Sequence, residues 1–182
     1  MNEKTLVLKT WKTKTLASVL AVIAAVAIPQ LVHMVGAVSG LGTSLGETLL
    51  PMHFAILVLG MLAGPIAGVA GAISPLLSFA LSGMPSAVML PFMMIELAGY
   101  GLAAGLVAKA NMPVFAKLVI AQLSGRVLRS IAVLIAFYGF GAGLPVASIW
   151  TSVVVGLPGI LLQWAIIPLL MFWIFKKAQK DE

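Results

Sequence analysis

The sequence predicts an all-α integral membrane protein with six transmembrane helices and both termini in the cytoplasm. Of its 182 residues, 62% are hydrophobic and only 9% are charged, whereas soluble domains carry about 25% charged residues. Long apolar runs alternate with short segments rich in proline, glycine or lysine, and lysines occur in only some of these segments. Such asymmetry is typical of multi-pass proteins. We therefore treat residues 1–182 as a single membrane domain.

The first predicted helix covers residues 15–36. Lysines precede it, and a basic leader followed by an apolar run also resembles a cleavable signal peptide. Apolar character continues through Val38, however, and about 20 apolar residues are enough to span a bilayer. We expect this segment to be retained as a helix.

Residues 51–81 decide the number of spans. As one helix they would be about 46 Å long, which is too long for one span and short for two. With one span here, the chain would have five, and the lysines of the 109–117 loop and the C-terminus would lie opposite the basic N-terminus. A break at 63–65 gives six spans and places every lysine on one side, as the positive-inside rule favours. We expect helices at 51–63 and 65–81.

Three further helices are predicted at 85–108, 113–139 and 145–175. Each begins at a proline, namely Pro85, Pro113 or Pro145, and glycines lie near their ends. The intervening segments 36–50, 82–85 and 140–145 contain no lysine or arginine. We therefore expect these three segments on the outer side of the membrane.

Composition excludes several functions. The chain has no cysteine, so disulfides, thiol catalysis and cysteine metal sites are excluded. It lacks a Walker A motif, and its one aspartate, Asp181, is the penultimate residue. His33 and His53 lack metal-site spacing, so we expect no enzyme activity, no cofactor and no metal. The net charge of +6 is concentrated beside the apolar runs, which indicates membrane orientation rather than nucleic-acid binding.

A polar constellation is predicted within the spans. Gln122, Arg126 and Arg129 are separated by four and three residues, so they share one helix face. Arg126 lies about 20 Å, and Arg129 about 24 Å, from the cytoplasmic start of its helix. On the antiparallel helix 85–108, Glu96 lies about 16 Å in from the outer end, and Tyr100 follows on the same face. Glu96 can therefore meet the arginines.

One carboxylate cannot neutralise two guanidiniums. Each charge near the bilayer centre costs about 2.5–3.5 kcal/mol. We expect one arginine to pair with Glu96 and the other to meet water, helix carbonyls or a ligand, with Arg126 as the more direct ligand contact. The alternative is a buried ion pair that only sets helix register.

Other polar side chains accompany this constellation. Three lie on the predicted outer side and complete the candidate substrate-binding set: His33, Glu47 and His53. Gln163 and Trp164 are weaker candidates, and Trp164 is expected mainly to pack.

Small residues recur at four-residue spacing, which lets helices approach closely in lipid. The series are Gly60, Gly64, Gly68 and Ala72; Gly101 and Gly105; and Ala17, Ala21 and Ala25. We expect the glycine series to pack inside the protein. The alanine series, in the cytoplasmic half of the first helix, could equally face a partner.

Three stretches of the chain are distinctive: "LPMHFAILVLGMLAGPIAGVAGAISPLLSFALSGMPS", "IELAGYGLAAGL" and "SGRVLRS". In this order they resemble the substrate-binding S components of energy-coupling factor (ECF) vitamin transporters. The similarity runs over residues 15–175. Its most specific parts are the Gly64-Pro65 break, Gly83-Met84-Pro85, Glu96 followed by Tyr100-Gly101, and Arg126.

This resemblance implies a six-helix protein of the prokaryotic plasma membrane that binds one water-soluble vitamin or precursor near the outer face. A transmembrane coupling protein and two cytoplasmic ATPase subunits would drive transport, together forming an ABC importer. Ala17, Ala21 and Ala25 would dock on the coupling protein, and the outer segments would gate the pocket. Hydroxymethylpyrimidine or pyridoxine is the favoured type of substrate, with pantothenate next. The alternative is a stand-alone oligomeric secondary transporter or channel for a small polar solute.

Overall fold

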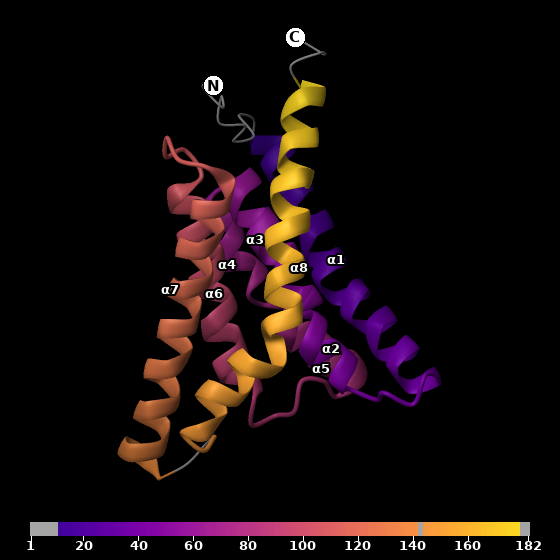
Figure 1. The fold of residues 1–182 in the computed structure, drawn as a ribbon, viewed down its shortest axis with the longest axis vertical. Coiled ribbons are helices and arrows are strands. Elements are labelled where there is room, and N and C mark those ends of the chain that lie inside the picture. Colours follow the sequence, from indigo (N-terminus) through magenta and orange to yellow (C-terminus); the bar gives the residue numbers. More distant parts are fainter. Residues whose placement is uncertain (1–10, 142–143, 179–182) are drawn as a thin grey trace.

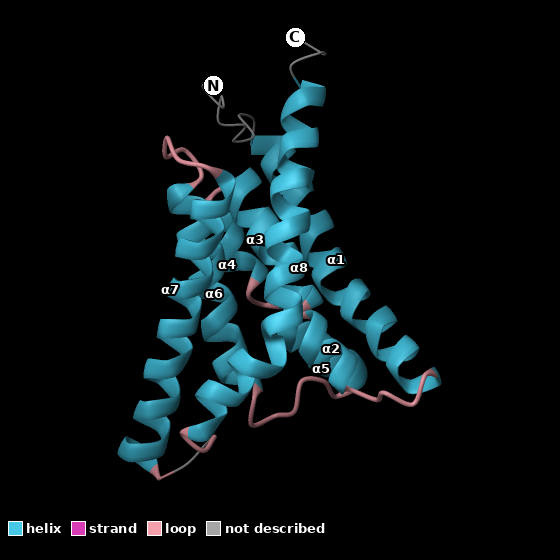
Figure 2. Cartoon of the chain, in the orientation of Figure 1, coloured by secondary structure: helices cyan, strands magenta, loops and turns pink. Residues whose placement is uncertain are grey.

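The computed structural model describes residues 11–141 and 144–178, and these residues are helical apart from short connections (Figures 1 and 2). The described part contains no strand. Its elements are α1 (Trp11–Val38), α2 (Ser44–Leu49), α3 (Pro51–Ala63), α4 (Pro65–Gly71), α5 (Ser74–Ser82), α6 (Leu90–Val107), α7 (Val114–Leu134), the π-helical turn η1 (Ile135–Gly139) and α8 (Ala147–Ala178).

These elements form six helical units long and apolar enough to cross a membrane. They are α1, α2 with α3, α4 with α5, α6, α7 with η1, and α8. The predicted all-α class and the predicted count of six are confirmed at this level. The central units are α3 and α6, whereas α1 and α8 are the least buried of the six.

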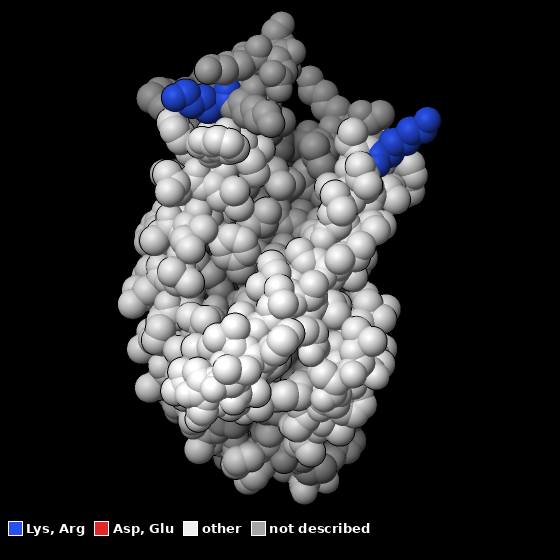
Figure 3. Space-filling view, turned by 90° about the vertical axis from the view of Figure 1, so that its right-hand side faces the viewer, with Lys and Arg blue, Asp and Glu red and all other residues white. Residues whose placement is uncertain are grey.

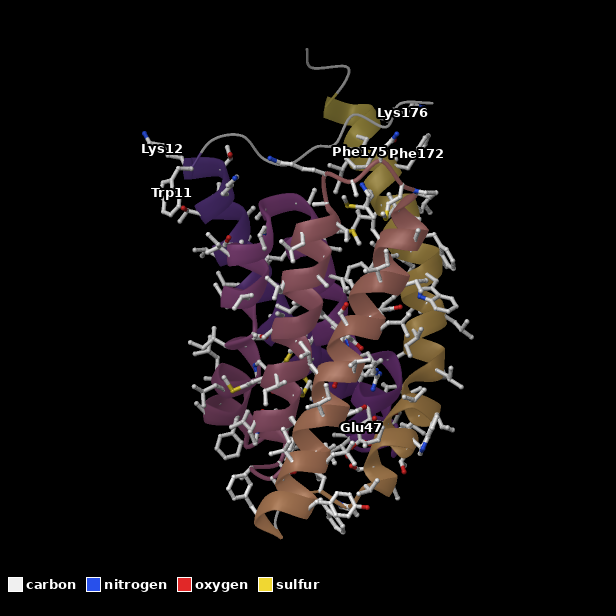
Figure 4. The ribbon with its side chains drawn as sticks, turned by 90° about the vertical axis from the view of Figure 1, so that its left-hand side faces the viewer. Trp11, Lys12, Glu47, Phe172, Phe175 and Lys176 are labelled. Atoms are coloured by element: carbon white, nitrogen blue, oxygen red, sulfur yellow. The ribbon has the colours of Figure 1, made fainter. Side chains whose placement is uncertain are left out.

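The two ends of the bundle differ in charge. The start of α1, the end of α8 and the connection between α6 and α7 lie at one end (Figure 1). We call it the lysine end because the described lysine side chains belong to it: Lys12, Lys14, Lys109, Lys117 and Lys176. On the face drawn in Figure 3, blue side chains appear only at this end, and Figure 4 shows Lys12 and Lys176 there, with Glu47 toward the opposite end. We call the opposite end, formed by the connections 39–43 and 83–89 and by the start of α8, the loop end. Lys4, Lys9 and Lys180 lie outside the described residues.

Two predicted boundaries were wrong. The segment 36–50 was expected to be a loop, but it contains α2, which ends because Pro51 disfavours a right-handed helical conformation at Leu50. Leu50 adopts a left-handed conformation with φ of 50°. The helix expected from Pro85 begins at Leu90 instead, since Pro91 suits the first turn, where an N–H group has no partner within the helix.

The break between α3 and α4 lies at Gly64, whose φ is 95° and ψ is 180°. Only glycine occupies this region readily. Pro65 follows as the first residue of α4, where its missing N–H costs nothing. The short pair of α4 and α5 separates again at Ala72 and Ile73, ahead of Pro75.

The glycine series pack inside the bundle. A Cβ atom added to Gly101 would lie 2.3 Å from backbone atoms of Gly68, and one added to Gly105 would lie 2.2 Å from the nitrogen of Pro65. A Cβ on Gly60 would lie 2.7 Å from the carbonyl oxygen of Gly101. The backbones of α3, α4 and α6 therefore touch directly.

The alanine series of α1 turns partly inward. Ala25 is fully buried in the core, while Ala17 and Ala21 are half-buried. The expectation that Ala25 docks on a partner is therefore wrong for this conformation, because neighbouring helices of the same chain cover it. Exposed apolar side chains such as Leu20 and Ile23 instead cover the outer face of α1.

Candidate functional site

A cavity of about 620 Å³ occupies the half of the bundle nearest the loop end. This volume falls within the range of about 300–1,000 Å³ typical of small-molecule pockets. Segments distant in sequence form its wall: α1 near Pro29 and His33, residues 43–53, Ser78 of α5, residues 84–93, and the first turns of α8. Glu96, Arg126 and Arg129 also line it.

Glu96 holds both arginines. Its Oε2 accepts a hydrogen bond of 2.9 Å from Arg129 Nη1, and its Oε1 lies 3.1 Å from Arg126 Nε. The carboxylate is completely buried. The prediction that only one arginine pairs with Glu96 was wrong, because the antiparallel α6 and α7 bring the carboxylate between two guanidiniums one turn apart.

Two further groups meet the same carboxylate. The Tyr100 hydroxyl donates to Glu96 Oε1 over 3.0 Å from one turn along α6. His53 Nε2 approaches Oε1 at 3.6 Å from α3, and its ring packs edge-on against Tyr100. Tyr100 thus supports Glu96 from beneath the cavity, whereas His53 is part of the cavity wall.

Several buried polar atoms beside the cavity have no partner. Arg126 Nη1 donates to Ser152 Oγ over 3.2 Å, but its Nη2 has no hydrogen bond. The same holds for Arg129 Nε, His33 Nδ1, His53 Nδ1 and Ser148 Oγ. Buried polar groups are normally paired, so this wall offers hydrogen-bonding capacity to a molecule in the cavity.

Glycines make room for two of these side chains. A Cβ on Gly156 of α8 would lie 3.3 Å from Arg126 Nη2 and 2.9 Å from Leu50 Cδ1. A Cβ on Gly46 of α2 would lie 2.5 Å from the His33 ring. The close packing of α2 between α1 and α8 therefore shapes the cavity wall.

Gln122 does not line the cavity. It lies one turn toward the lysine end from Arg126, where its Nε2 donates to Gln163 Oε1 over 2.8 Å and its Oε1 accepts from Trp164 Nε1 over 2.6 Å. Gln163 Nε2 in turn donates to the carbonyl oxygen of Leu50 over 3.2 Å. These three side chains tie α7 and α8 to the junction of α2 and α3, so Trp164 does more than pack.

The remaining predicted residues lie at different depths. His33 and Glu47 are in the outer part of the cavity wall, and Glu47 is exposed to solvent. The expected gating segments contribute Thr43, Met84 and Pro85, among others, although residues 142 and 143 of the third segment lie outside the described residues. Ala17, Ala21 and Ala25 do not line the cavity.

Sequence reasoning missed two groups of lining residues. Ser148 and Ser152 lie four residues apart at the start of α8, a spacing that could have placed them on one face. The other group comprises the methionines Met52, Met84, Met89 and Met93. Nothing in an apolar span distinguishes a methionine that faces a cavity from one that faces lipid or core.

Neither protein-family models, nor curated proteins, nor solved structures give a match to this chain. Within the described ranges, no cluster of three or more His, Cys, Asp or Glu side chains has the arrangement needed to hold a metal ion.

Proposed function

We propose that this protein is the substrate-binding membrane subunit of an ECF-type vitamin importer. It captures a water-soluble vitamin or precursor at the outer face of a prokaryotic plasma membrane. The observation that carries the proposal is a cavity with buried charges at its inner end. It lies in the half of the six-helix bundle that holds none of the described lysine side chains. The sequence resemblance supplies the family.

The shape of the cavity supports capture rather than conduction. Along α6 its wall reaches no further than Glu96. Beyond this level the lysine-end half is filled by core side chains that include Leu97, Tyr100, Leu118 and Ile167, each at most 1% exposed. A closed inner end suits a subunit that binds its solute tightly and releases it only after a conformational change.

The charge pattern supports the orientation. Translocating lysine is costly, so the lysine end faces the cytoplasm and the loop end faces outward. Thr43→Cys should then react with an impermeant thiol reagent applied outside intact cells, and Asn111→Cys should react only after permeabilisation. The chain has no native cysteine to interfere. External labelling of Asn111→Cys would reverse the orientation and move the cavity to the cytoplasmic side.

Energy comes from partners in this proposal. The chain has no Walker A motif, so a coupling protein and two ATPase subunits supply the work. Half-buried Ala17 and Ala21 lie in the cytoplasmic half of α1 and offer a surface of small side chains for the coupling protein. Ala21→Trp should abolish energised uptake and leave binding by the isolated chain unchanged.

Reconstitution tests the proposal directly. The purified chain in nanodiscs should bind a vitamin in isothermal titration calorimetry, with hydroxymethylpyrimidine, pyridoxine and pantothenate as the first compounds to test. Liposomes should accumulate that vitamin only when the chain is combined with the coupling protein and ATP-hydrolysing subunits. Uptake by the chain alone would instead establish a stand-alone transporter or channel.

A further inference from the structure

The cavity carries an unbalanced charge at its inner end. Arg126 and Arg129 share Glu96, and their side chains are only 14% and 10% exposed. Two guanidiniums and one carboxylate leave one positive charge. Burying an unpaired charge is costly, so a ligand that supplies one negative charge would stabilise this end of the cavity.

The other acidic residue of the cavity does not remove the imbalance. Glu47 lies on α2 in the outer part of the wall and is exposed to solvent. Within the described residues it forms no ion pair with either arginine. Water screens its charge, so it contributes little to the electrostatic balance at the buried inner end.

The unused donors lie close to the surplus charge. Arg126 Nη2 has no partner, and Arg126 Nη1 bonds to Ser152, one helical turn from Ser148, whose hydroxyl is also unpartnered. The unpartnered Nη2 group of the guanidinium and the unpartnered Ser148 hydroxyl together suit an oxyanion with two oxygens. A phosphate carries about 1.5–2 negative charges near neutral pH and would exceed the surplus, whereas a carboxylate matches it.

The rest of the wall indicates the body of the ligand. Met52, Met84, Met89 and Met93 contribute flexible, polarisable thioethers from α3, α6 and the segment before α6. Methionine sulfur adapts to varied apolar shapes and makes favourable contacts with aromatic rings.

We infer that the captured molecule is a small organic carboxylate, whose carboxylate binds Arg126 and Ser148 and whose apolar or aromatic body lies against the methionines. This inference rests on the proposed capture function and narrows its substrate class. It favours acids such as pantothenate over pyridoxine and hydroxymethylpyrimidine, because a neutral ring leaves the surplus charge unpaired.

Matched pairs of compounds test the inference without any substitution. The full chain in nanodiscs would be titrated with pantothenate and panthenol, nicotinate and nicotinamide, and 4-pyridoxate and pyridoxine. In any pair that binds, we expect the acid to bind about tenfold to a hundredfold more tightly, the effect of one charge-assisted hydrogen bond. A neutral member that binds equally well or better would overturn the inference and leave the capture function intact.

Variants locate the contact. Arg126→Gln should abolish the preference for the acid, and Ser148→Ala should reduce it by a smaller factor. Ser124→Ala is the matched control, because its hydroxyl bonds to Ile120 within α7 and lies outside the cavity. If Arg126→Gln does not fold, the Ser148→Ala variant and the compound pairs still test whether the ligand is bound through a carboxylate. An acid preference unchanged in both variants would overturn the assignment.

Native mass spectrometry covers the case in which no pair binds. The chain extracted from membranes would be searched for a co-purified small molecule. A carboxylate would support the inference, and a neutral or cationic molecule would overturn it. No bound molecule, together with no binding to any pair, would count against the capture function itself and therefore against both proposals.

Discussion

The two halves of the bundle differ in how closely their helices pack, although the same helices run through both. In the lysine-end half, Gly68, Gly101 and Gly105 let α4 and α6 touch backbone to backbone. In the loop-end half, α6 carries Glu96 and Met93, and the helices surround a cavity of about 620 Å³. One helix therefore supplies both a close contact and a cavity wall.

This difference shows how the two halves are stabilised. Close packing in the lysine-end half depends on the absence of side chains, because in lipid the packing itself drives helix association. The loop-end half also has close glycine contacts, such as Gly46 against the His33 ring, but around its cavity it depends in addition on ion pairs to Glu96 and on the glutamine bonds near Leu50. Substitutions can separate these two sources of stability.

The largest effect is expected for Glu96→Gln. Removing the carboxylate leaves two buried guanidiniums without an anion, and breaking a buried ion pair typically costs about 3–5 kcal/mol. We expect a strong fall in the thermal midpoint of the ligand-free chain in detergent, followed by tryptophan fluorescence.

Tyr100→Phe is the matched control for Glu96→Gln. It removes one hydrogen bond to the same carboxylate, which should cost only about 0.5–1.5 kcal/mol. Equal stability of Glu96→Gln and the unmodified chain would show that the ion pairs do not hold the loop-end half together.

Gly101→Ala should destabilise the closely packed lysine-end half. The new Cβ would lie 2.3 Å from backbone atoms of Gly68, so α4 and α6 must move apart. Overpacking of this kind costs about 1–3 kcal/mol. The thermal midpoint should fall, while ligand affinity at a temperature where the variant is folded should change little.

Gly139→Ala provides the control for Gly101→Ala. Its Cβ would meet only the Ile135 side chain, at 4.0 Å, so stability should be unchanged or slightly raised. A Gly101→Ala variant as stable as Gly139→Ala would mean that the backbone contact between α4 and α6 is absent in the membrane.

Gln163→Leu alters a polar contact at the boundary between the two halves. It removes the bonds to Gln122 and to the Leu50 carbonyl. Interhelical hydrogen bonds in membrane proteins average about 0.6 kcal/mol each, so we expect a loss of about 1 kcal/mol. Adding Gln122→Leu should cost less than the sum of the single changes, as a double-mutant cycle on chemical unfolding would show. Full additivity would indicate that the two glutamines do not interact.

The smallest effect is expected for Leu123→Ala. Leu123 follows Gln122 on α7 but is 60% exposed. If it faces lipid, the change in unfolding free energy should stay within about 0.5 kcal/mol, and the chain should elute unchanged from a sizing column. A large loss, or a change in apparent mass, would place a subunit interface on α7.

Local chemistry let the sequence determine much of this protein. Apolar length, the conformational demands of Gly64 and Pro65, and lysine asymmetry are properties of short segments, and they were enough to predict six helices. Spacing of three and four residues likewise placed Arg126 and Arg129 on one face of α7. The contact between these arginines and Glu96 was predicted because α6 and α7 are consecutive, antiparallel helices that carry them at similar depth.

Only the tertiary structure decided how deep each polar side chain lies in the bundle and which side chains it contacts. Gln122 shares a face with Arg126 but lies about 6 Å further along the axis, which puts it below the cavity and against Gln163. Whether one or both arginines would reach Glu96 depended on how closely α6 and α7 approach. Gly99 and Gly125 allow that approach, since a Cβ on Gly99 would lie 2.8 Å from the Cα of Gly125. The contributions of Ser148 and the methionines depended on α8 and the segment 83–89 closing over the same space. Such contacts join residues far apart in the chain, and no local pattern encodes them.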